Sequence, residues 1–521
     1  MDLQNQLLHI IYNYILEREL DNFNIFKYSL LLLTLFGIFI LQENKIYGEI
    51  GYISNYFIPG FTQGTPNYEI ITFNWINQNT PPNSIINSWW DYGYYIYVLG
   101  NRTAWINGAN AYPYWNHLMG RYGLSSDNIT QTLELFYVHA NYNYQTFKTL
   151  ELFNENSVFY DYLYRYLGFN ESEINEIKKL KDSLGYKNWI NLLYQFNGSP
   201  ESIASYNLSK QDIKLLEKLY NMNYLRPAYL YIDPTDIGKS FAFQFLGSNE
   251  SYDKESWISP FVSGMTVNPG PAIPSVYYNG YYIFATNNSL FYFGQEPLDE
   301  TLNINGTIIN RCIYVQNLGI INQNSCGNIT GVQLLFNQSI VKRSGIYQTL
   351  DINNINSDNL IGAYVYIYNP LNNQQYALSL KYVYINGQLV TFNDSQYGGL
   401  LYISPAYSLL RQQNPVGLFL YAYLISQKAT QYDWVQLYFL DNNYNGTFDL
   451  VFYSNLPYGF PPIIYYDIPP AKVWKINFPE NFTVPDYLYC IYLATNIQQI
   501  DECGKIYNLA YYKNLKDYYD V

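Results

Sequence analysis

The chain has 521 residues, a formal net charge of −13 and a pI near 4.7. This length predicts about two to four domains, and the acidic balance, with no cluster of Lys or Arg, argues against a nucleic-acid partner. Charged residues make up only 13% and tyrosines number 62, so neutral hydrogen-bonding groups dominate. Neutral groups keep their hydrogen bonds in acid, where carboxylates become protonated and lose their ion pairs. The composition is therefore compatible with an exterior surface exposed to acid.

The first strong pattern is an apolar stretch at residues 25–41, IFKYSLLLLTLFGIFIL. Its length is at the short end of the range for a membrane-spanning helix. A signal peptide is the alternative, but no small-x-small cleavage site follows. Residues 1–24 predict an amphipathic interfacial helix, and the flanking charges Arg18 and Lys27 lie before the apolar core of the span. The positive-inside rule then predicts a single-pass protein of the cell membrane, with everything after about residue 45 outside the cell.

From residue 46 to 270, strand and helix patterns alternate, which predicts a mixed α/β domain. The predicted elements are a strand at 84–90, a helix at 128–150 capped by Ser125, Ser126 or Asp127, a helix from 209, a strand at 225–233 and a helix at 236–247.

After residue 270, short runs of Tyr, Val, Ile and Phe alternate with Asn-Gly, Gly and Pro turns. The segments 382–392, 434–453 and 472–478 are typical of hairpins. We therefore predict an α+β protein with one N-terminal transmembrane helix and one or two β-rich C-terminal domains. The predicted divisions are 1–45 for the amphipathic segment and span, 46–270 for the central domain and 271–521 for the β-rich part.

The four cysteines form two close pairs, Cys312 with Cys326 and Cys490 with Cys503. This spacing predicts two short-loop disulfides in an oxidising exterior, with four buried free thiols as the alternative. Asn-x-Ser/Thr acceptor triplets also favour the exterior, although an Asn-rich chain produces some by chance. The triplets begin at Asn101, Asn128, Asn170, Asn197, Asn207, Asn249, Asn287, Asn305, Asn328, Asn337, Asn393, Asn445 and Asn481.

Several common sources of chemistry are absent from the sequence. It contains no phosphate-binding loop, no dinucleotide glycine motif, no HExxH and no GxSxG elbow. The histidines His9, His117 and His139 lack the spacing of metal ligands. We therefore predict no catalytic residue and no metal ligand of these kinds in the chain.

Two adjacent tryptophans precede an acid in Trp89-Trp90-Asp91-Tyr92-Gly93. One interpretation is a buried aromatic corner in which Asp91 caps a turn. However, the stretch resembles the WWDYG motif of the catalytic subunit of oligosaccharyltransferase, the archaeal and eukaryotic enzyme of asparagine-linked glycosylation. The flanks NTPPN at 79–83, Asn-Arg-Thr at 101–103 and YWNHLMGRYGLSS at 114–126 also look like this family.

The family's second motif has the form Asp-x-x-Lys-x-x-x-Met/Ile. Asp236, Lys239 and Phe243 match it with one departure, since Phe243 stands where Met or Ile is usual. That departure puts in doubt how the pocket touches a threonine methyl group. The resemblance covers roughly residues 70–270, and beyond them 472–478 is similar only in texture to the family's terminal β-domain.

The resemblance implies a site that binds the acceptor's +2 Ser or Thr. Indole N–H groups donate and a carboxylate accepts, so Trp89, Trp90 and Asp91 would bind the hydroxyl, with Tyr92 and Gly93 shaping the turn. A second wall of the pocket would consist of Asp236, Lys239 and Phe243. A site built for a hydroxyl rejects ligands that lack it more strongly than an apolar pocket does.

In this family, acidic residues in external loops of a multi-span N-terminal part hold a divalent cation, Mn or Mg, and the lipid-linked oligosaccharide. The chain has one predicted span, so those ligands are expected elsewhere. The resemblance thus implies the acceptor-recognising C-terminal part of a glycosyltransferase, with an acceptor polypeptide, the lipid-linked glycan and a multi-span N-terminal half as partners. The alternatives are a non-enzymatic, membrane-anchored glycosylated surface protein and a sequon-binding relative without catalysis.

Overall fold

A computed structural model describes residues 67–155, 157–247, 258–262, 275–278, 281–298, 300–315, 319–321, 324–344, 347–408, 418–454, 458–460, 463–465 and 471–509. The predicted interfacial helix at 1–24 and the predicted span at 25–41 lie outside these residues. Within the described part, no helix has both the length and the hydrophobicity that crossing a bilayer requires.

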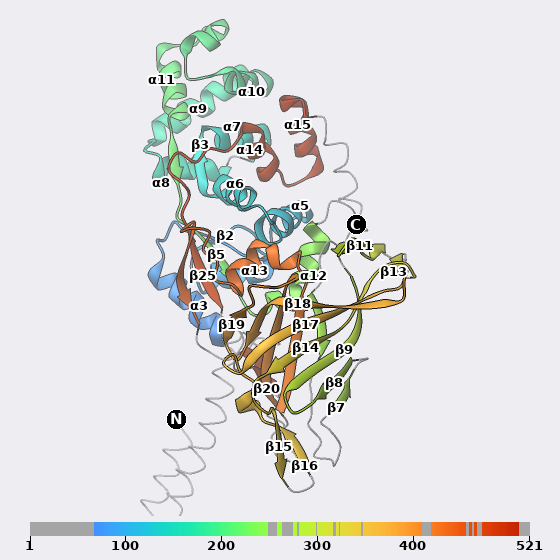
Figure 1. The fold of residues 1–521 in the computed structure, drawn as a ribbon. Helices are drawn as coiled ribbons and strands as arrows, with labels where there is room; N and C mark the ends of the chain where they lie inside the picture. The colour runs from blue at the N-terminus through green and yellow to red at the C-terminus, as the bar shows by residue number, and fades with distance from the viewer. Residues whose placement is uncertain are drawn as a thin grey trace, which may run out of the picture. The chain divides into compact units, whose positions relative to one another are not determined.

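Five strands of the described residues form the sheet that matters most for the site (Figure 1). Their order is β2 (Thr103–Ala104), β1 (Ile85–Asn87), β5 (Ala228–Ile232), β25 (Lys472–Ile476) and β22 (Phe448–Tyr453). Strand β1 is parallel to both β2 and β5, whereas β25 is antiparallel to β5. All five residues of β5 are buried, as expected for a central strand with a continuous apolar run. The strands predicted near 84–90 and 225–233 are confirmed.

Helices and short helical turns make up most of the remaining chain up to residue 247 and return near the C-terminus. They are α3 (Asn67–Asn79), η1 (Trp90–Tyr92), α4 (Gly93–Val98), α5 (Pro113–Leu118), η2 (Met119–Leu124), α6 (Ile129–Ala140), α7 (Tyr144–Leu152), α8 (Ser157–Tyr166), α9 (Glu171–Leu184), α10 (Tyr186–Gln195), η3 (Pro200–Tyr206), α11 (Lys210–Tyr220), α12 (Asp236–Gly247), η5 (Ala429–Gln431), α13 (Asp433–Tyr438), α14 (Asp486–Leu493) and α15 (Ile497–Tyr507).

Helix starts follow local capping chemistry. Ser209 accepts from the backbone N–H of Asp212, and the Asp212 side chain accepts in return from the Ser209 backbone, which closes a capping box before α11. The helix predicted from 209 is therefore confirmed. The single helix predicted at 128–150 is wrong, because β3 (Asn141–Asn143) separates α6 from α7 and pairs with β4 (Asn223–Leu225). Its N-cap is also Asn128, not one of the three preceding residues.

The β-rich part is built around a long sheet, of which twelve strands lie in described residues. These strands are β6 (Ile258–Val262), β7 (Ser275–Tyr278), β8 (Tyr281–Ala285), β9 (Ser289–Pro297), β14 (Asn328–Phe336), β17 (Leu360–Asn369), β18 (Gln374–Ile385), β19 (Gln388–Thr391), β20 (Tyr397–Ser408), β21 (Leu418–Ile425), β23 (Tyr458–Phe460) and β24 (Ile463–Tyr465). Small ladders join β10 (Leu302–Ile304) to β11 (Thr307–Ile309), β12 (Ile313–Val315) to β13 (Gly319–Ile321) and β15 (Val341–Ser344) to β16 (Tyr347–Leu350). A short turn, η4 (Ile352–Asn354), precedes β17.

The hairpin predicted at 382–392 is confirmed as β18 and β19. Asn386 and Gly387 form its two-residue turn with φ values of 49° and 77°, because both central residues of this tight hairpin turn need positive φ. The hairpin predicted at 434–453 is wrong in its first half, which is helix α13. In a short apolar run, the apolar residues follow neither the 3.6-residue period of an amphipathic helix nor the alternation of a half-buried strand. The pattern therefore cannot distinguish a buried helix from a buried strand.

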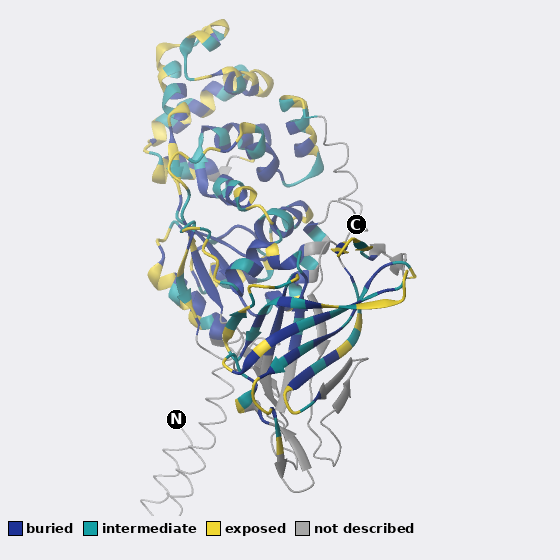
Figure 2. Cartoon of the chain, viewed as in Figure 1, coloured by how far each residue is buried: buried dark blue, intermediate teal, exposed yellow. Residues whose placement is uncertain are grey.

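The described residues contain two hydrophobic cores, and strand β20 borders both. Leu400 and Tyr402 belong to the core shared with the helices and the five-stranded sheet, whereas Leu401 and Ile403 belong to the core of the β-rich part. Successive side chains of a strand point to opposite faces, so one strand can close both cores. Figure 2 shows buried residues in dark blue on the strands of the five-stranded sheet and of the long sheet. Mixed α and β structure with a β-rich C-terminal part is thus confirmed.

Segments beyond residue 270 also complete the central sheet. Strands β22 and β25 extend the sheet that begins with β1 and β5, and α14 packs against α6 and α7. Some residues after 270 therefore pack with the predicted central domain and not with the β-rich part. The extent of each domain stays a prediction.

Both predicted disulfides are confirmed. Cys312 pairs with Cys326 at a Cα–Cα distance of 4.9 Å, and Cys490 of α14 pairs with Cys503 of α15 at 5.7 Å. No free cysteine is found among the described residues. Such bonds persist in oxidising compartments, and the exterior location of this part of the chain stays a prediction.

Candidate functional site

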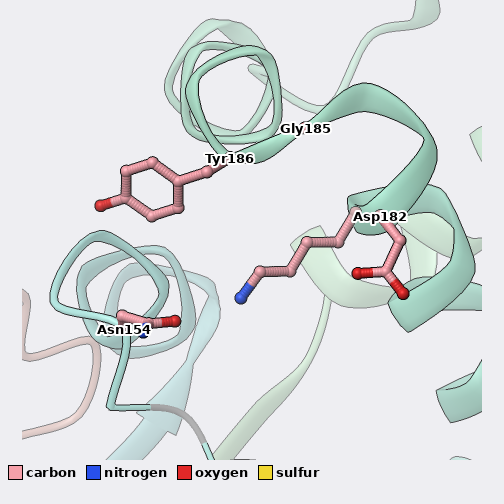
Figure 3. A pocket seen from close by; sticks show the side chains of 5 residues that line it. Asn154, Asp182, Gly185 and Tyr186 are labelled. Carbon is pink, nitrogen blue, oxygen red and sulfur yellow. The ribbon is translucent and has the colours of Figure 1, made fainter.

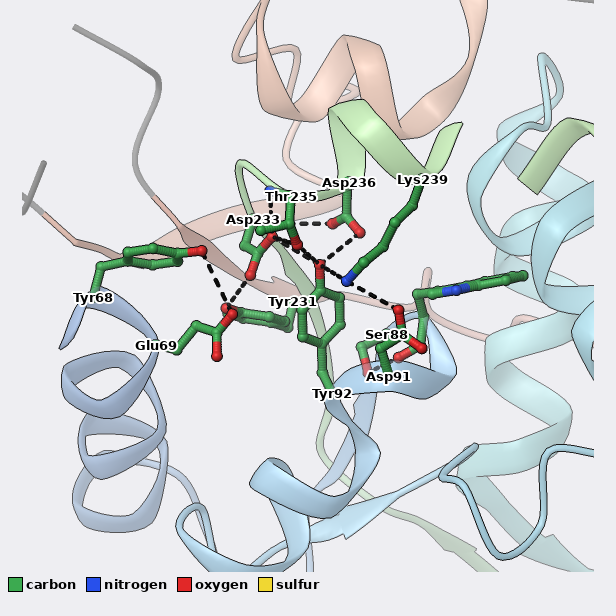
Figure 4. Close-up of polar contacts among 11 residues, drawn as sticks. Tyr68, Glu69, Ser88, Asp91, Tyr92, Tyr231, Asp233, Thr235, Asp236 and Lys239 are labelled. Atoms are coloured by element: carbon green, nitrogen blue, oxygen red, sulfur yellow. Dashed lines mark hydrogen bonds and ion pairs between the residues drawn. The ribbon is translucent and has the colours of Figure 1, made fainter. Parts of the chain in front are cut away.

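The two motifs singled out in the sequence meet at one edge of the five-stranded sheet. The first follows β1 and the second follows β5, and Asn87 at the end of β1 lies opposite Leu230 of β5. Because the strands are parallel, their carboxyl ends lie at the same edge, where the following loops converge. This explains how residues separated by about 150 positions in the chain reach one another (Figure 4).

The motif after β1 forms the short turn η1, and its two tryptophans have different surroundings. Trp89 is buried, with 3% of its surface exposed, and its ring packs on that of Phe243 at a centroid distance of 4.7 Å. Trp90 retains 36% exposure. Trp90 is therefore accessible at the surface, whereas Trp89 is packed in the interior.

Asp91 and Lys239 form an ion pair, with 3.1 Å between Oδ2 and Nζ. The Asp91 side chain is 31% exposed and that of Lys239 26%, so both charges reach the surface while their stems are covered. Burial by itself lowers the pKa of Lys239, but Asp233, Asp236 and Asp91 together raise it above the ordinary value. Lys239 is therefore held as a cation.

Beneath this pair, the hydroxyl of Tyr92 is the centre of a buried network. It donates to Asp233 Oδ1 at 2.7 Å, contacts Asp236 Oδ1 at 2.9 Å and accepts from Lys239 Nζ at 2.9 Å. The Lys239 ammonium also lies 4.0 Å from the centroid of the Tyr92 ring, a cation–π geometry. Tyr92 thus ties the turn after β1 to helix α12.

Asp233, directly after β5, was not among the residues predicted from the sequence. It is fully buried, and its oxygens accept from the Thr235 backbone N–H at 2.7 Å and from Tyr231 at 2.9 Å. Glu69 of α3, also missed, is 5% exposed, and the neighbouring Asp233 is one of the causes that raise its pKa. A position at the carboxyl end of a buried strand could have indicated Asp233, whereas no local pattern indicates Glu69.

The buried acids keep protons that exposed acids would lose. Burial first, and the nearby Asp233 carboxylate second, raise the pKa of Asp236 to about 8 and raise the pKa of Glu69 well above its usual range. Burial also raises the pKa of Tyr92. At neutral pH the network therefore contains neutral carboxyls that can donate hydrogen bonds.

Of the three residues predicted to form the second wall of the pocket, only Lys239 reaches the surface. Asp236 is 2% exposed and Phe243 is 0% exposed, with the Phe243 ring between those of Trp89 and Trp434. Asp236, Lys239 and Phe243 share one face of α12 because of their i, i+3, i+7 spacing. Phe243 thus supports the Trp89 ring from inside, and any contact with a ligand stays a prediction.

The Asn-Arg-Thr flank at 101–103 is structural. Arg102 is buried, donating from Nε to Thr80 Oγ1 at 2.8 Å and from Nη2 to the Asn77 carbonyl at 2.7 Å, where it caps the end of α3. Thr103 Oγ1 accepts from Arg226 at 2.6 Å. These contacts fix the frame around β1 and do not belong to the candidate site.

The described residues contain no group of three or more His, Cys, Asp and Glu side chains arranged to hold a metal ion. The buried acids near Lys239 do not fit a divalent cation, because their oxygens are engaged by hydroxyl and backbone donors and an ammonium lies beside them.

A separate open pocket of about 500 Å³ lies among α7, α9 and α10 (Figure 3). It is lined by Asn154, Lys181, Asp182, Gly185 and Tyr186, none of which was predicted as a site residue.

Comparisons with known proteins bear on the motifs. No family model matches the chain. It is 38% identical over 72 residues to the rice (Oryza sativa subsp. japonica) dolichyl-diphosphooligosaccharide–protein glycosyltransferase subunit STT3B, over 12% of this chain and 9% of that protein. This confirms the resemblance over a short stretch, and the chain spans less than a tenth of that relative's length. A crystal structure of the C. jejuni pglb C-terminal domain aligns with 79% of this chain and 100% of that one, at 15% identity and a TM-score of 0.29.

Proposed function

We propose that this chain is the acceptor-recognising part of an oligosaccharyltransferase, which transfers a glycan from a lipid (di)phosphate to the Asn amide of Asn-x-Ser/Thr. The observation that carries the proposal is the Asp91–Lys239 pair, which joins two motifs distant in sequence beside the exposed Trp90. Neither motif alone would require its residues to lie together. Their meeting at a sheet edge supports a single site.

The geometry suits a hydroxyl ligand. The Asp91 carboxylate would accept a hydrogen bond from the acceptor's +2 hydroxyl, and the indole N–H of Trp90 would donate to the oxygen of that hydroxyl. The buried Trp89 ring and the Phe243 ring beneath it limit water on the inner side. A hydrogen bond to a charged group contributes about 1.5–3 kcal/mol, which corresponds to roughly a 10- to 100-fold preference for Thr over Ala at +2.

The remaining parts of the reaction belong to partners. The lipid-linked oligosaccharide and a divalent cation, Mn or Mg, would be bound by a multi-span membrane half, since the described residues offer no fitting ligand group. Such a cation would offset the charge on the departing phosphate. This chain's own role would be to bind and orient the acceptor at the exterior face of the cell membrane, with residues 25–41 as the proposed anchor.

Peptide binding tests the proposal. We expect the purified chain to bind a fluorescent Asn-x-Thr peptide at least about tenfold more tightly than the matched Asn-x-Ala peptide, and to transfer no glycan by itself. Asp91→Ala should remove the preference, because the hydroxyl loses its acceptor. Fluorescence anisotropy measures both affinities.

A surface ion pair supplies the control. Asp161 pairs with Arg165 at 2.9 Å on exposed α8, so Asp161→Ala removes an equivalent charge and should leave the Thr preference unchanged. Equal affinities of the wild-type chain for Thr and Ala peptides would refute acceptor recognition and favour a non-enzymatic surface protein. Robust glycan transfer by the chain alone would refute the division of labour with a membrane half.

A further inference from the structure

Four carboxyl groups surround the single ammonium group of Lys239 and its neighbour Tyr92. Asp91 is partly exposed, but Glu69, Asp233 and Asp236 are 5%, 0% and 2% exposed. Burying a charge is costly unless it is paired and hydrogen-bonded. One ammonium cannot neutralise four carboxylates, so the arrangement is stable only when some of the buried acids keep their protons.

The hydrogen bonds of Tyr92 lead to the same conclusion. Its hydroxyl has one proton to donate and two lone pairs to accept with, yet it faces oxygens of Asp233 at 2.7 Å and Asp236 at 2.9 Å. If both acids were ionised, they would compete for one proton. With Asp236 neutral, Tyr92 donates to Asp233, accepts from Asp236 and still accepts from Lys239 at 2.9 Å.

Glu69 completes the opposite side of the cluster. Asp233 accepts from Tyr92 and Thr235 on one oxygen and from Tyr231 on the other. Glu69 is 5% exposed, and burial and the neighbouring Asp233 raise its pKa well above its usual range. Two neighbouring buried carboxyl groups form a hydrogen bond only when one carries a proton. A neutral Glu69 would donate to Asp233 and join α3 to the turn after β5.

We propose that Glu69 and Asp233 are positioning residues of the acceptor site, which hold Lys239, and through it Asp91, in place for the acceptor hydroxyl. The inference rests on the proposed function and deepens it. While the buried acids keep their protons, Lys239 remains shared between Tyr92 and Asp91. When they ionise, the growing negative charge attracts the ammonium inward and Asp91 loses its partner.

The proton balance involves every ionisable group that faces the cluster. These groups are Tyr68 and Glu69 on α3, Asp91 and Tyr92 on η1, Tyr231 on β5, Asp233 in the following turn, Asp236 and Lys239 on α12, and Tyr438 on α13. Burial raises the pKa of the tyrosines Tyr92, Tyr231 and Tyr438 well above 10. The tyrosines therefore stay neutral between pH 6 and 9, whereas burial raises the pKa of Asp236 into this range, to about 8.

Replacing Glu69 in two ways tests the proposal. Glu69→Gln substitutes a neutral side chain that still donates to Asp233, so it should keep the wild-type ratio of Ala-peptide to Thr-peptide dissociation constants at pH 6.5. Glu69→Ala removes the donor and should lower that ratio about tenfold at pH 6.5, the equivalent of one lost hydrogen bond. In the wild type the ratio should fall about tenfold between pH 6.5 and 9, and Glu69→Gln should make this fall shallower.

A chemically identical change elsewhere is the matched control. Glu151 is fully buried and accepts from Lys181 Nζ at 2.8 Å and Trp189 Nε1 at 2.9 Å. Glu151→Gln should lower resistance to urea but leave both the peptide ratio and its pH profile unchanged. A wild-type ratio and profile in both Glu69 variants would overturn the positioning role while leaving acceptor recognition intact. Absence of any Thr preference in the wild-type chain would instead refute the proposed function.

Discussion

Gly93→Ala is expected to destabilise the chain by about 3 kcal/mol or more. A β-carbon at Gly93 would lie 2.2 Å from the carbonyl oxygen of Ile106 and 2.4 Å from the Cα of Asn107. Both atoms are backbone, so relief requires the turn after β1 or the segment after β2 to move. That movement would also shift Asp91 and Tyr92, and the variant should lose preference for Thr peptides together with stability.

Gly238→Ala is the matched control for this prediction. Gly238 is an exposed residue inside α12, and a β-carbon there would meet nothing within 4 Å. Alanine is favoured over glycine in a helix interior by about 1 kcal/mol, so this variant should gain stability. Urea unfolding followed by tryptophan fluorescence compares the two. A loss below about 1 kcal/mol for Gly93→Ala would contradict the close backbone approach.

The stability of the chain is expected to fall as the pH rises from 6.5 to 8. Asp236 has a folded-state pKa raised to about 8, and that of Glu69 is raised well above its usual range. A raised carboxyl pKa favours the protonated form in the folded state, so the stabilisation is complete below about pH 4 and is lost as the pH approaches the folded pKa. A retained proton corresponds to about 1.4 kcal/mol per pH unit, so Asp236 alone predicts a loss of about 2 kcal/mol over this interval.

The interval is chosen because other groups act only below it. Burial lowers the pKa of His117 to about 4 and that of His139 to about 3, so those residues remove stability only as the pH falls below about 6.5. Burial raises the pKa of Asp433 to about 6, so the effect of this group on stability is largely complete at pH 6.5. Urea midpoints at pH 6.5 and 8.0 measure the fall, and Asp236→Asn should flatten it. A midpoint that stays constant or rises in the wild type would show that the buried acids do not retain their protons.

Local patterns in the sequence were enough to identify many pieces of this protein. Strand β5 was predicted from a continuous apolar run, helix α11 from Ser209 and its apolar spacing, and both disulfides from cysteines 14 and 13 residues apart. Each of these depends on interactions within a few residues, where period, capping and loop length act directly. The WWDYG and Asp-x-x-Lys motifs were recognisable for the same reason, since each is a short contiguous string.

Tertiary structure decided which of these pieces form a site. Parallel pairing of β1 with β5 brings Asp91 to Lys239, and the packing of α3 adds Glu69, for which no neighbouring residue gave a signal. Residues 434–438 belong to the buried helix α13, although their apolar run was equally compatible with a strand. Contacts between distant segments depend on burial and hydrogen bonding summed over the whole chain. Only the assembled fold therefore determines the raised pKa of Asp236, the hydrogen-bond network around Tyr92 and the closure of both cores by β20.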